Sequence, residues 1–134
     1  MAFWILKTEP ASYSYDDLER DGQTIWDGVA NAQALIHIRN MTAGDEALIY
    51  HSGDERALIG LAQIVSAPYA DPQLADPKRV VVAVRAVQRL AQPVPLSAIK
   101  ADPQFAQLGL VRQSRLSVVP VAAGEWSRLI EMGT

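Results

Sequence analysis

Cysteine is absent from the 134-residue sequence. Its absence excludes disulfide bonds, thiolate metal sites and a cysteine nucleophile. Histidine is scarce as well, because His37 and His51 are the only two in the chain, and histidine-based metal sites need several such ligands. The sequence therefore predicts a protein without a bound metal or other cofactor.

Long hydrophobic runs are also missing. No segment approaches the roughly 18 consecutive apolar residues that a membrane-spanning helix needs. The apolar start, residues 1–7, is too short for a signal peptide. We therefore expect no membrane association, and a soluble protein in the cytoplasm, or in the nucleus if the source is eukaryotic.

An excess of positive charge is the third feature that the sequence lacks. The formal net charge is −3 and the isoelectric point is about 5.3. Proteins that coat duplex nucleic acid usually carry a basic surface, because contacts to phosphates supply most of the nonspecific affinity. Binding of nucleic acid by this chain would need a local basic patch, or recognition of a single base or nucleotide.

The composition that remains is that of an ordinary globular protein. Hydrophobic residues make up 49% of the chain and charged residues 20%, which argues against disorder or a fibrous structure. The length suits one domain, and no repeat or linker interrupts the sequence. Residues 1–134 are therefore predicted to form a single domain.

Hydrophobic periodicity and turn residues predict a mixture of short strands and helices. The expected strands are 3–7, 47–52, 57–67, 80–90 and 116–119, and the expected helices are 15–20, 31–41, 96–100, 104–108 and 123–132. Segments 24–29 and 68–78 are interpreted as loops. Five strands with helices between them indicate an α+β fold around one strongly curved sheet, either open or closed into a barrel.

Local sequence features support individual elements. Ser14 and Asp17 have the spacing of a capping box, which begins a helix, and Asn31 is suited to cap the next one. Gly60 falls inside a predicted strand, where glycine often marks a bulge or a close approach of the backbone.

Trp26 is the first candidate for ligand binding, because it stands near Gly28 in a predicted loop. An indole in such a place can stack on a planar base, which is worth roughly 1–3 kcal/mol. The alternative is packing in the core, the more common fate of a large aromatic side chain. Asn31 offers a donor and an acceptor to a base edge, and Lys7 can neutralise a phosphate or remain solvated.

No complete catalytic set is visible, so we expect a binding protein and not an enzyme. His51 and Ser52 are neighbours in a predicted strand, and their side chains should point to opposite faces without forming a nucleophile–base pair. Nucleotide-binding and hydrolase motifs are absent. Arg112 and Arg115 flank the start of a strand, where their guanidinium groups can clamp a phosphate or face solvent.

A series of short motifs runs through nearly the whole chain in a fixed order. They are Trp4-Ile5-Leu6-Lys7-Thr8-Glu9-Pro10, Tyr13-Ser14, Trp26-Asp27-Gly28-Val29, Asn31, Gln33-Ala34, Arg39-Asn40-Met41, Gly44-Asp45, Tyr50-His51-Ser52, Gly60-Leu61-Ala62, Tyr69-Ala70-Asp71-Pro72, Arg115-Leu116-Ser117-Val118, Pro120-Val121 and Trp126. Taken in this order, the motifs resemble the EVE domain family.

The resemblance implies a PUA-like fold, in which a curved mixed β-sheet forms a pseudo-barrel with inserted helices. It also implies kinship with PUA, ASCH and YTH modules, and hence a reader of a modified nucleobase in DNA or RNA, acting beside a restriction-type nuclease partner. By analogy with the aromatic cage of YTH relatives, the expected cage residue is Trp26. The other expected pocket residues are Trp4, Lys7, Asn31, Tyr50, His51 and Ser52.

The chain departs from the family pattern at three positions. Members of the family commonly carry arginine, tyrosine and arginine where this sequence has Ala30, Ala32 and Leu35. If those side chains contact the nucleic-acid backbone or frame the pocket, this chain has lost part of that surface. Two alternatives to a base reader therefore stay open: a binder of, or enzyme acting on, free nucleosides or nucleotides, and a protein-interaction module.

Overall fold

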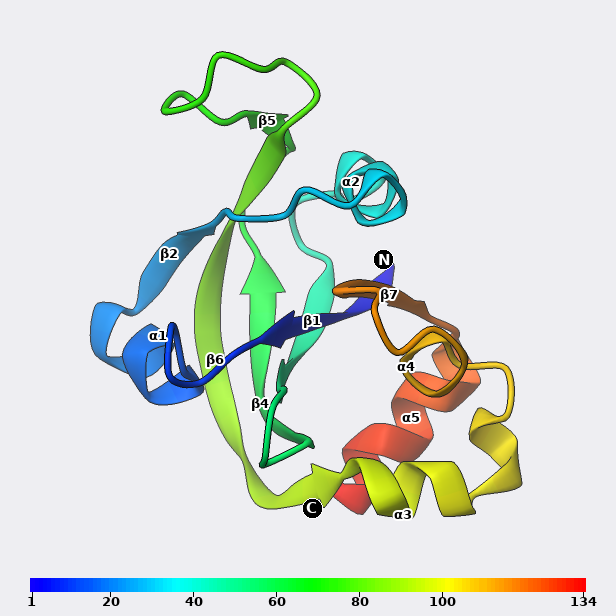
Figure 1. The fold of residues 1–134 in the computed structure, drawn as a ribbon. Helices are drawn as coiled ribbons and strands as arrows, with labels where there is room; N and C mark the ends of the chain where they lie inside the picture. Colours follow the sequence, from blue (N-terminus) through cyan, green and yellow to red (C-terminus); the bar gives the residue numbers. More distant parts are fainter.

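The computed structural model describes residues 1–134 as a strongly curved, seven-stranded sheet surrounded by helices (Figure 1). The strands are β1 Phe3–Thr8, β2 Gln23–Trp26, β3 Glu46–His51, β4 Ala57–Ile64, β5 Tyr69–Ala70, β6 Val80–Pro95 and β7 Val118–Val121. The helices are α1 Tyr15–Asp21, α2 Ala32–Arg39, α3 Leu96–Ala101, α4 Gly109–Arg112 and α5 Ala123–Met132, with a 3-10 turn at Pro103–Phe105. The predicted α+β fold is confirmed. None of the helices combines the length and the apolar character that crossing a bilayer requires.

The order of strands in the sheet is β2-β6-β4-β3-β1-β7, and β5 pairs with the start of β6. β1 and β3 are parallel, whereas the other neighbouring strands are antiparallel. Because β2 and β7 each have a single neighbour, the sheet is open, and these two short strands are its ends. Helix α2 packs against both β6 and β7 and so bridges part of the opening.

Curvature arises where the register of β4 breaks. The register shifts against β6 just before Gly60 and again just after Leu61, and it shifts against β3 after Ile49. Such irregularities bend a sheet and increase its twist. Tyr15 of α1 lies over Gly60, and its hydroxyl donates a hydrogen bond of 2.7 Å to the Leu61 carbonyl. The close approach predicted for Gly60 is therefore confirmed.

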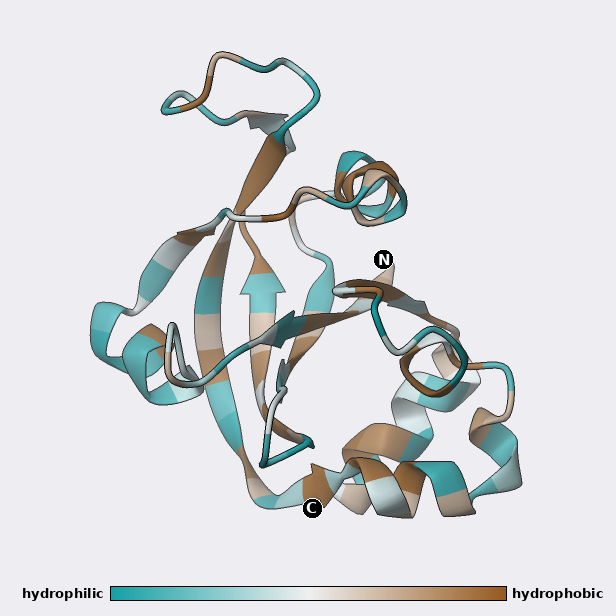
Figure 2. Ribbon diagram, viewed as in Figure 1, coloured by the Kyte–Doolittle hydropathy of each residue, from teal (hydrophilic) through white to brown (hydrophobic).

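The core consists of 33 buried hydrophobic residues drawn from every strand except β5 and from the helices around the sheet. In Figure 2 the hydrophobic colour follows β7 and the first part of β6, whereas α1 and the loop after β5 are largely hydrophilic. Helix α1 begins with the predicted capping box, since Ser14 and Asp17 each bond the other's backbone N–H. Asn31 caps α2, as its position in the sequence predicts.

Two strands lie in segments that the sequence pattern assigns to loops. β2 covers Gln23–Trp26, because its backbone pairs with residues 82–85 of β6. β5 covers Tyr69–Ala70 and pairs with the start of the same strand. In both cases the partner lies far along the chain, so local composition alone gives the wrong assignment.

Other boundaries also differ from the prediction. β6 continues past Leu90 to Pro95, because its last residues pair with β4. β7 begins at Val118 and includes Pro120, which an edge strand tolerates because one side of its backbone needs no partner. The predicted helix 104–108 is replaced by the 3-10 turn and α4, and α2 ends at Arg39.

Gly60→Ala should destabilise the protein by about 1–3 kcal/mol, the usual cost of overpacking a core. A Cβ at this position would lie 2.2 Å from Cζ of Tyr15, and the ring cannot move without disturbing its bond to Leu61. Urea denaturation measures the free energy of unfolding. Gly124→Ala is the matched control, because a Cβ there meets no atom within 4 Å. Equal effects of the two substitutions would contradict this explanation.

Candidate functional site

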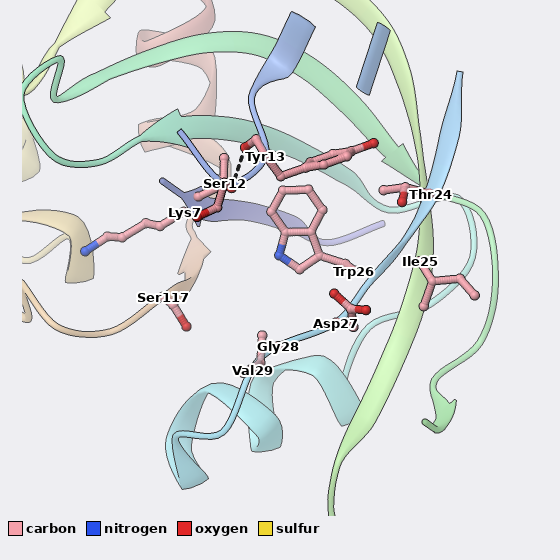
Figure 3. Close-up of a pocket in the computed structure, with 11 residues that line it drawn as sticks. Lys7, Ser12, Tyr13, Thr24, Ile25, Trp26, Asp27, Gly28, Val29 and Ser117 are labelled. Atoms are coloured by element: carbon pink, nitrogen blue, oxygen red, sulfur yellow. Dashed lines mark hydrogen bonds between the residues drawn. The ribbon is translucent and has the colours of Figure 1, made fainter. Parts of the chain in front are cut away.

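A pocket of about 480 Å³ opens between the two ends of the sheet. β2 supplies one wall, and the end of β1 together with the residue before β7 supplies the other (Figure 3). The lining residues are Lys7, Thr8, Ser12, Tyr13, Thr24, Ile25, Trp26, Asp27, Gly28, Val29 and Ser117. The pocket therefore occupies the gap that remains because β2 and β7 do not pair.

Hydrogen bonds hold both walls in place: β2 is held by its pairing with β6, and the other wall is held by two further bonds. The backbone N–H of Lys7 donates to the Ser117 carbonyl at 2.9 Å. Thr8 Oγ1 donates to the Tyr13 carbonyl at 2.6 Å, which fastens the loop after β1 to its own strand. The walls are thus formed before any ligand arrives, and binding does not have to order them.

The loop after β2 is also fixed. Gly28 has a φ of +79°, a left-handed conformation that favours glycine. The next residue, Val29, is held through its carbonyl, which accepts a hydrogen bond of 2.9 Å from Arg79 Nε. This turn carries the chain from β2 along the pocket and into α2.

Trp26 forms the inner wall of the pocket. The residue is only 7% exposed, and its ring packs edge-to-face on Tyr13 with ring centroids 6.3 Å apart. Burial raises the pKa of Tyr13. The indole Nε1 of Trp26 has no partner in the protein and is not sealed from solvent, and in Figure 3 it lies on the side of Gly28 and Ser117. Trp26 is therefore largely packed, and it offers an N–H donor to the pocket.

The pocket contains one cation and one anion, Lys7 and Asp27, which lie at opposite sides of it (Figure 3). Nζ of Lys7 donates to the Ser114 carbonyl at 3.0 Å and lies 5.8 Å from the centre of the Tyr50 ring. Burial lowers the pKa of Lys7. Asp27 makes no hydrogen bond and no ion pair within the chain, so its carboxylate is free to meet a ligand.

Trp4, a predicted pocket residue, lies outside the pocket. Its Nε1 donates to Asp45 Oδ2 at 3.0 Å, and the same carboxylate accepts hydrogen bonds from the backbone N–H groups of Ala2 and Thr42. Burial alone would raise the pKa of Asp45, but these three donors outweigh burial and hold that pKa below its ordinary value. Trp4 anchors the start of the sheet.

Tyr50, His51 and Ser52 do not line the pocket either. Tyr50 is buried beneath the Lys7 amine. The backbone N–H of Tyr15 donates to His51 Nε2 at 2.9 Å, which leaves Nδ1 to carry the hydrogen toward Glu55 Oε1 at 2.6 Å. Ser52 Oγ donates to a backbone carbonyl of β1. The three side chains support the site from outside it.

Asn31, Arg112 and Arg115 line a second depression, next to the pocket. Its complete lining is Asn31, Gln33, Arg112, Gln113, Ser114, Arg115 and Leu116. The chain passes from the pocket into this depression twice, after Val29 and before Ser117. The Asn31 side-chain oxygen is occupied by its cap of α2 at 3.0 Å, whereas neither arginine forms an ion pair. Of the nine predicted site residues, Lys7 and Trp26 meet in the pocket and these three meet beside it.

Several residues that line the pocket are not singled out as site residues by the sequence. They are chiefly Ser12, Tyr13, Thr24 and Ser117. They come from segments far apart in the sequence, and only the curvature of the sheet brings them together. Their sole signal in the sequence is that Tyr13 and Ser117 fall within the motifs that resemble the EVE family. No three His, Asp or Glu side chains converge in a way that could hold a metal ion.

Comparisons with known proteins identify the family and the fold that this chain shares. The EVE domain model matches residues 2–132. Mouse thymocyte nuclear protein 1 is 29% identical over 164 residues, which cover 97% of this chain and 73% of that protein. Protein Rpa0253 of Rhodopseudomonas palustris is 40% identical, with a TM-score of 0.94 over 99% of this chain and 93% of that one.

Human THYN1, crystallised in complex with 5-methylcytosine containing DNA, is 28% identical, with a TM-score of 0.92 over 99% of this chain and 98% of that one. A likeness in fold alone extends to the ASCH protein of Zymomonas mobilis, which is 11% identical, with a TM-score of 0.64 over 98% of this chain and 96% of that one. The expected PUA-like, ASCH-type arrangement is thereby confirmed.

Asp45→Asn should lower the free energy of unfolding at pH 7 by about 1.5–3 kcal/mol, because hydrogen bonds to a charged acceptor are lost. The folded-state pKa of Asp45 is depressed, so its contribution is complete above the unfolded pKa of about 3.9 and is lost as the pH falls through the folded value. The difference between the two proteins should therefore shrink below about pH 4. Urea denaturation at pH 7 and pH 3 measures it.

Asp54→Asn is the control for this experiment, because Asp54 is exposed and accepts no hydrogen bond. It should change stability at neither pH. A loss for Asp45→Asn that stays constant from pH 7 to pH 3 would contradict the role of the carboxylate charge.

Proposed function

The chain belongs to the EVE domain family, and on that premise we propose that it binds a modified base of DNA in the pocket between β2 and β7. The first candidate base is 5-methylcytosine. The observation that carries the proposal is the DNA complex of human THYN1, whose fold matches this chain over nearly its whole length. The pocket volume of about 480 Å³ falls within the roughly 300–1,000 Å³ of small-molecule sites.

Recognition requires that the base leaves the duplex stack. Extrusion costs a few kcal/mol, least for a mismatched or unpaired base. The buried position of Trp26 favours contact through its indole N–H over stacking on a fully open ring face. Val29 supplies apolar surface for an added methyl group, whose burial is worth about 0.8 kcal/mol.

The depression beside the pocket supplies the positive charge that an extruded nucleotide needs. Arg112 and Arg115 lie there without carboxylate partners, and the Lys7 amine is bonded to Ser114 in its lining. Guanidinium groups bind phosphate oxygens in a bidentate fork. We propose that the phosphates flanking the base lie in this depression, which is the local basic patch that a chain of net charge −3 requires.

We propose binding without catalysis. The acid and the base of the pocket, Asp27 and Lys7, lie at opposite sides of it, and both ring nitrogens of His51 are engaged elsewhere. A restriction-type nuclease partner, and a nuclear location in a eukaryotic source, follow from the family resemblance and remain predictions.

Binding of a free nucleoside is the second candidate. Ala30 and Ala32 are exposed where the chain leaves the pocket, and Leu35 is buried in the core. None of the three positions therefore offers a charged or aromatic group to a nucleic-acid backbone. Competition by the free nucleoside distinguishes the two candidates. If the protein reads a base in DNA, free nucleoside added at the same concentration as the DNA should displace little of the bound DNA.

Trp26→Phe should weaken binding of a duplex that contains one 5-methylcytosine by about tenfold, because the indole N–H is lost while an aromatic ring is kept. Fluorescence anisotropy with a labelled duplex measures the dissociation constant, beside the same duplex with cytosine. Trp126→Phe is the matched control, since that ring stacks on Phe3 with centroids 4.7 Å apart, outside the pocket lining. Failure of the unsubstituted protein to prefer the modified duplex would refute the proposed function.

Arg112→Ala and Arg115→Ala should weaken binding to modified and unmodified duplexes alike. Each loses a contact to phosphate, so the slope of the logarithm of affinity against the logarithm of salt concentration should fall by about one per arginine. Titrations at several salt concentrations measure the slope. Lys100→Ala removes an exposed cation that lines neither depression and should leave the slope unchanged. An unchanged slope in the arginine variants would mean that the phosphates do not bind in this depression.

A further inference from the structure

Asp27 is the only carboxylate among the residues that line the pocket. The carboxylates of α1 are paired, for example Asp16 and Glu19 with Arg89, but Asp27 has no partner. Lys7, the only cation of the pocket, is bonded to a backbone carbonyl on the other side. The pocket therefore contains a carboxylate that the protein itself does not neutralise.

A free carboxylate is an unexpected feature in a site for a polyanion, since it repels phosphate. It accepts hydrogen bonds and donates none, so it favours the part of a base that carries N–H groups. Among base edges, the amino group of cytosine is the usual partner of aspartate and glutamate. The corresponding position of thymine is a carbonyl oxygen, which a carboxylate repels.

Trp26, the residue before Asp27, adds a hydrogen-bond donor beside this acceptor. Trp26 offers an N–H donor, and Asp27, next to it in the chain, offers an acceptor. Cytosine presents the complementary pair, because its ring nitrogen N3 accepts and the adjacent amino group donates. The left-handed turn at Gly28 carries the chain away immediately afterwards, so that Asp27 is at the rim and not in the core.

Resting on the function proposed above, we infer that Asp27 determines specificity: its carboxylate accepts a hydrogen bond from the exocyclic amino group of the bound pyrimidine. The pocket then selects 5-methylcytosine against thymine, which carries the same methyl group at the same ring position. Burial of the methyl group cannot discriminate between these two bases, because both carry it. The amino group of cytosine and the carbonyl oxygen of thymine can be discriminated, because only the amino group can donate to the carboxylate.

The test compares two duplexes that differ only in one base, 5-methylcytosine or thymine, placed opposite an abasic site so that neither base is paired. We expect the unsubstituted protein to bind the 5-methylcytosine duplex about 10- to 100-fold more tightly, as one good base contact allows. Asp27→Asn should bring the ratio close to one, because an amide can both accept from the amino group and donate to the thymine oxygen. Asp27 is exposed, so the substitution should leave the thermal unfolding midpoint unchanged.

Asp54→Asn is the matched control, since it removes an exposed, unpaired carboxylate that does not line the pocket; it should keep the selectivity of the unsubstituted protein. An Asp27→Asn variant that keeps that selectivity, or that gains affinity equally for both duplexes, would overturn the inference and leave the proposed function standing. Failure of the unsubstituted protein to bind either duplex, or a 5-methylcytosine duplex with normal pairing, would instead refute the proposed function.

Discussion

The register breaks in β4 are the constraint on which the rest of the structure depends. They fall around Gly60, where the ring of Tyr15 rests directly on the backbone. A sheet kinked there bends so far that β2 and β7, at opposite ends of the strand order, become the two sides of one opening. Helix α2 bridges part of that opening and hydrogen bonds hold the loops beside it, so a cavity remains where a closed barrel would have continuous pairing.

The distribution of charge explains how an acidic protein can serve an anionic ligand. The carboxylates of α1 are balanced by Arg20 and Arg89 on the same side of the molecule. Arg112, Arg115 and Lys7 have no such partners, and they gather along the segment that leads from the pocket. The net charge of −3 is thus a sum over separate regions, and it does not describe the field that a phosphate meets beside the pocket.

The features that can be predicted from the sequence are those with a local physical cause. The Ser14 cap, the Asn31 cap and the close approach at Gly60 each depend on residues a few positions apart or on glycine itself. Features that depend on a distant partner are not predictable in this way: β2 is a strand because it pairs with β6. The lining of the pocket could not be predicted for the same reason, because Tyr13 and Ser117 lie near Trp26 only through the curvature of the sheet. His51 is directed away from the pocket by its bonds to α1 and Glu55.

The energetics of the pocket limit what kind of selectivity it can have. Burial of one methyl group is worth about 0.8 kcal/mol, which corresponds to roughly a fourfold preference. On the function proposed above, apolar contact with Val29 therefore separates 5-methylcytosine from cytosine only modestly. Hydrogen-bonding groups discriminate more strongly, because a mismatched base leaves a polar atom unpaired or facing like charge. The protein's own hydrogen bonds hold the walls of the pocket. On the function proposed above, Trp26 and Asp27 therefore select the base, and burial of the methyl group adds a smaller preference.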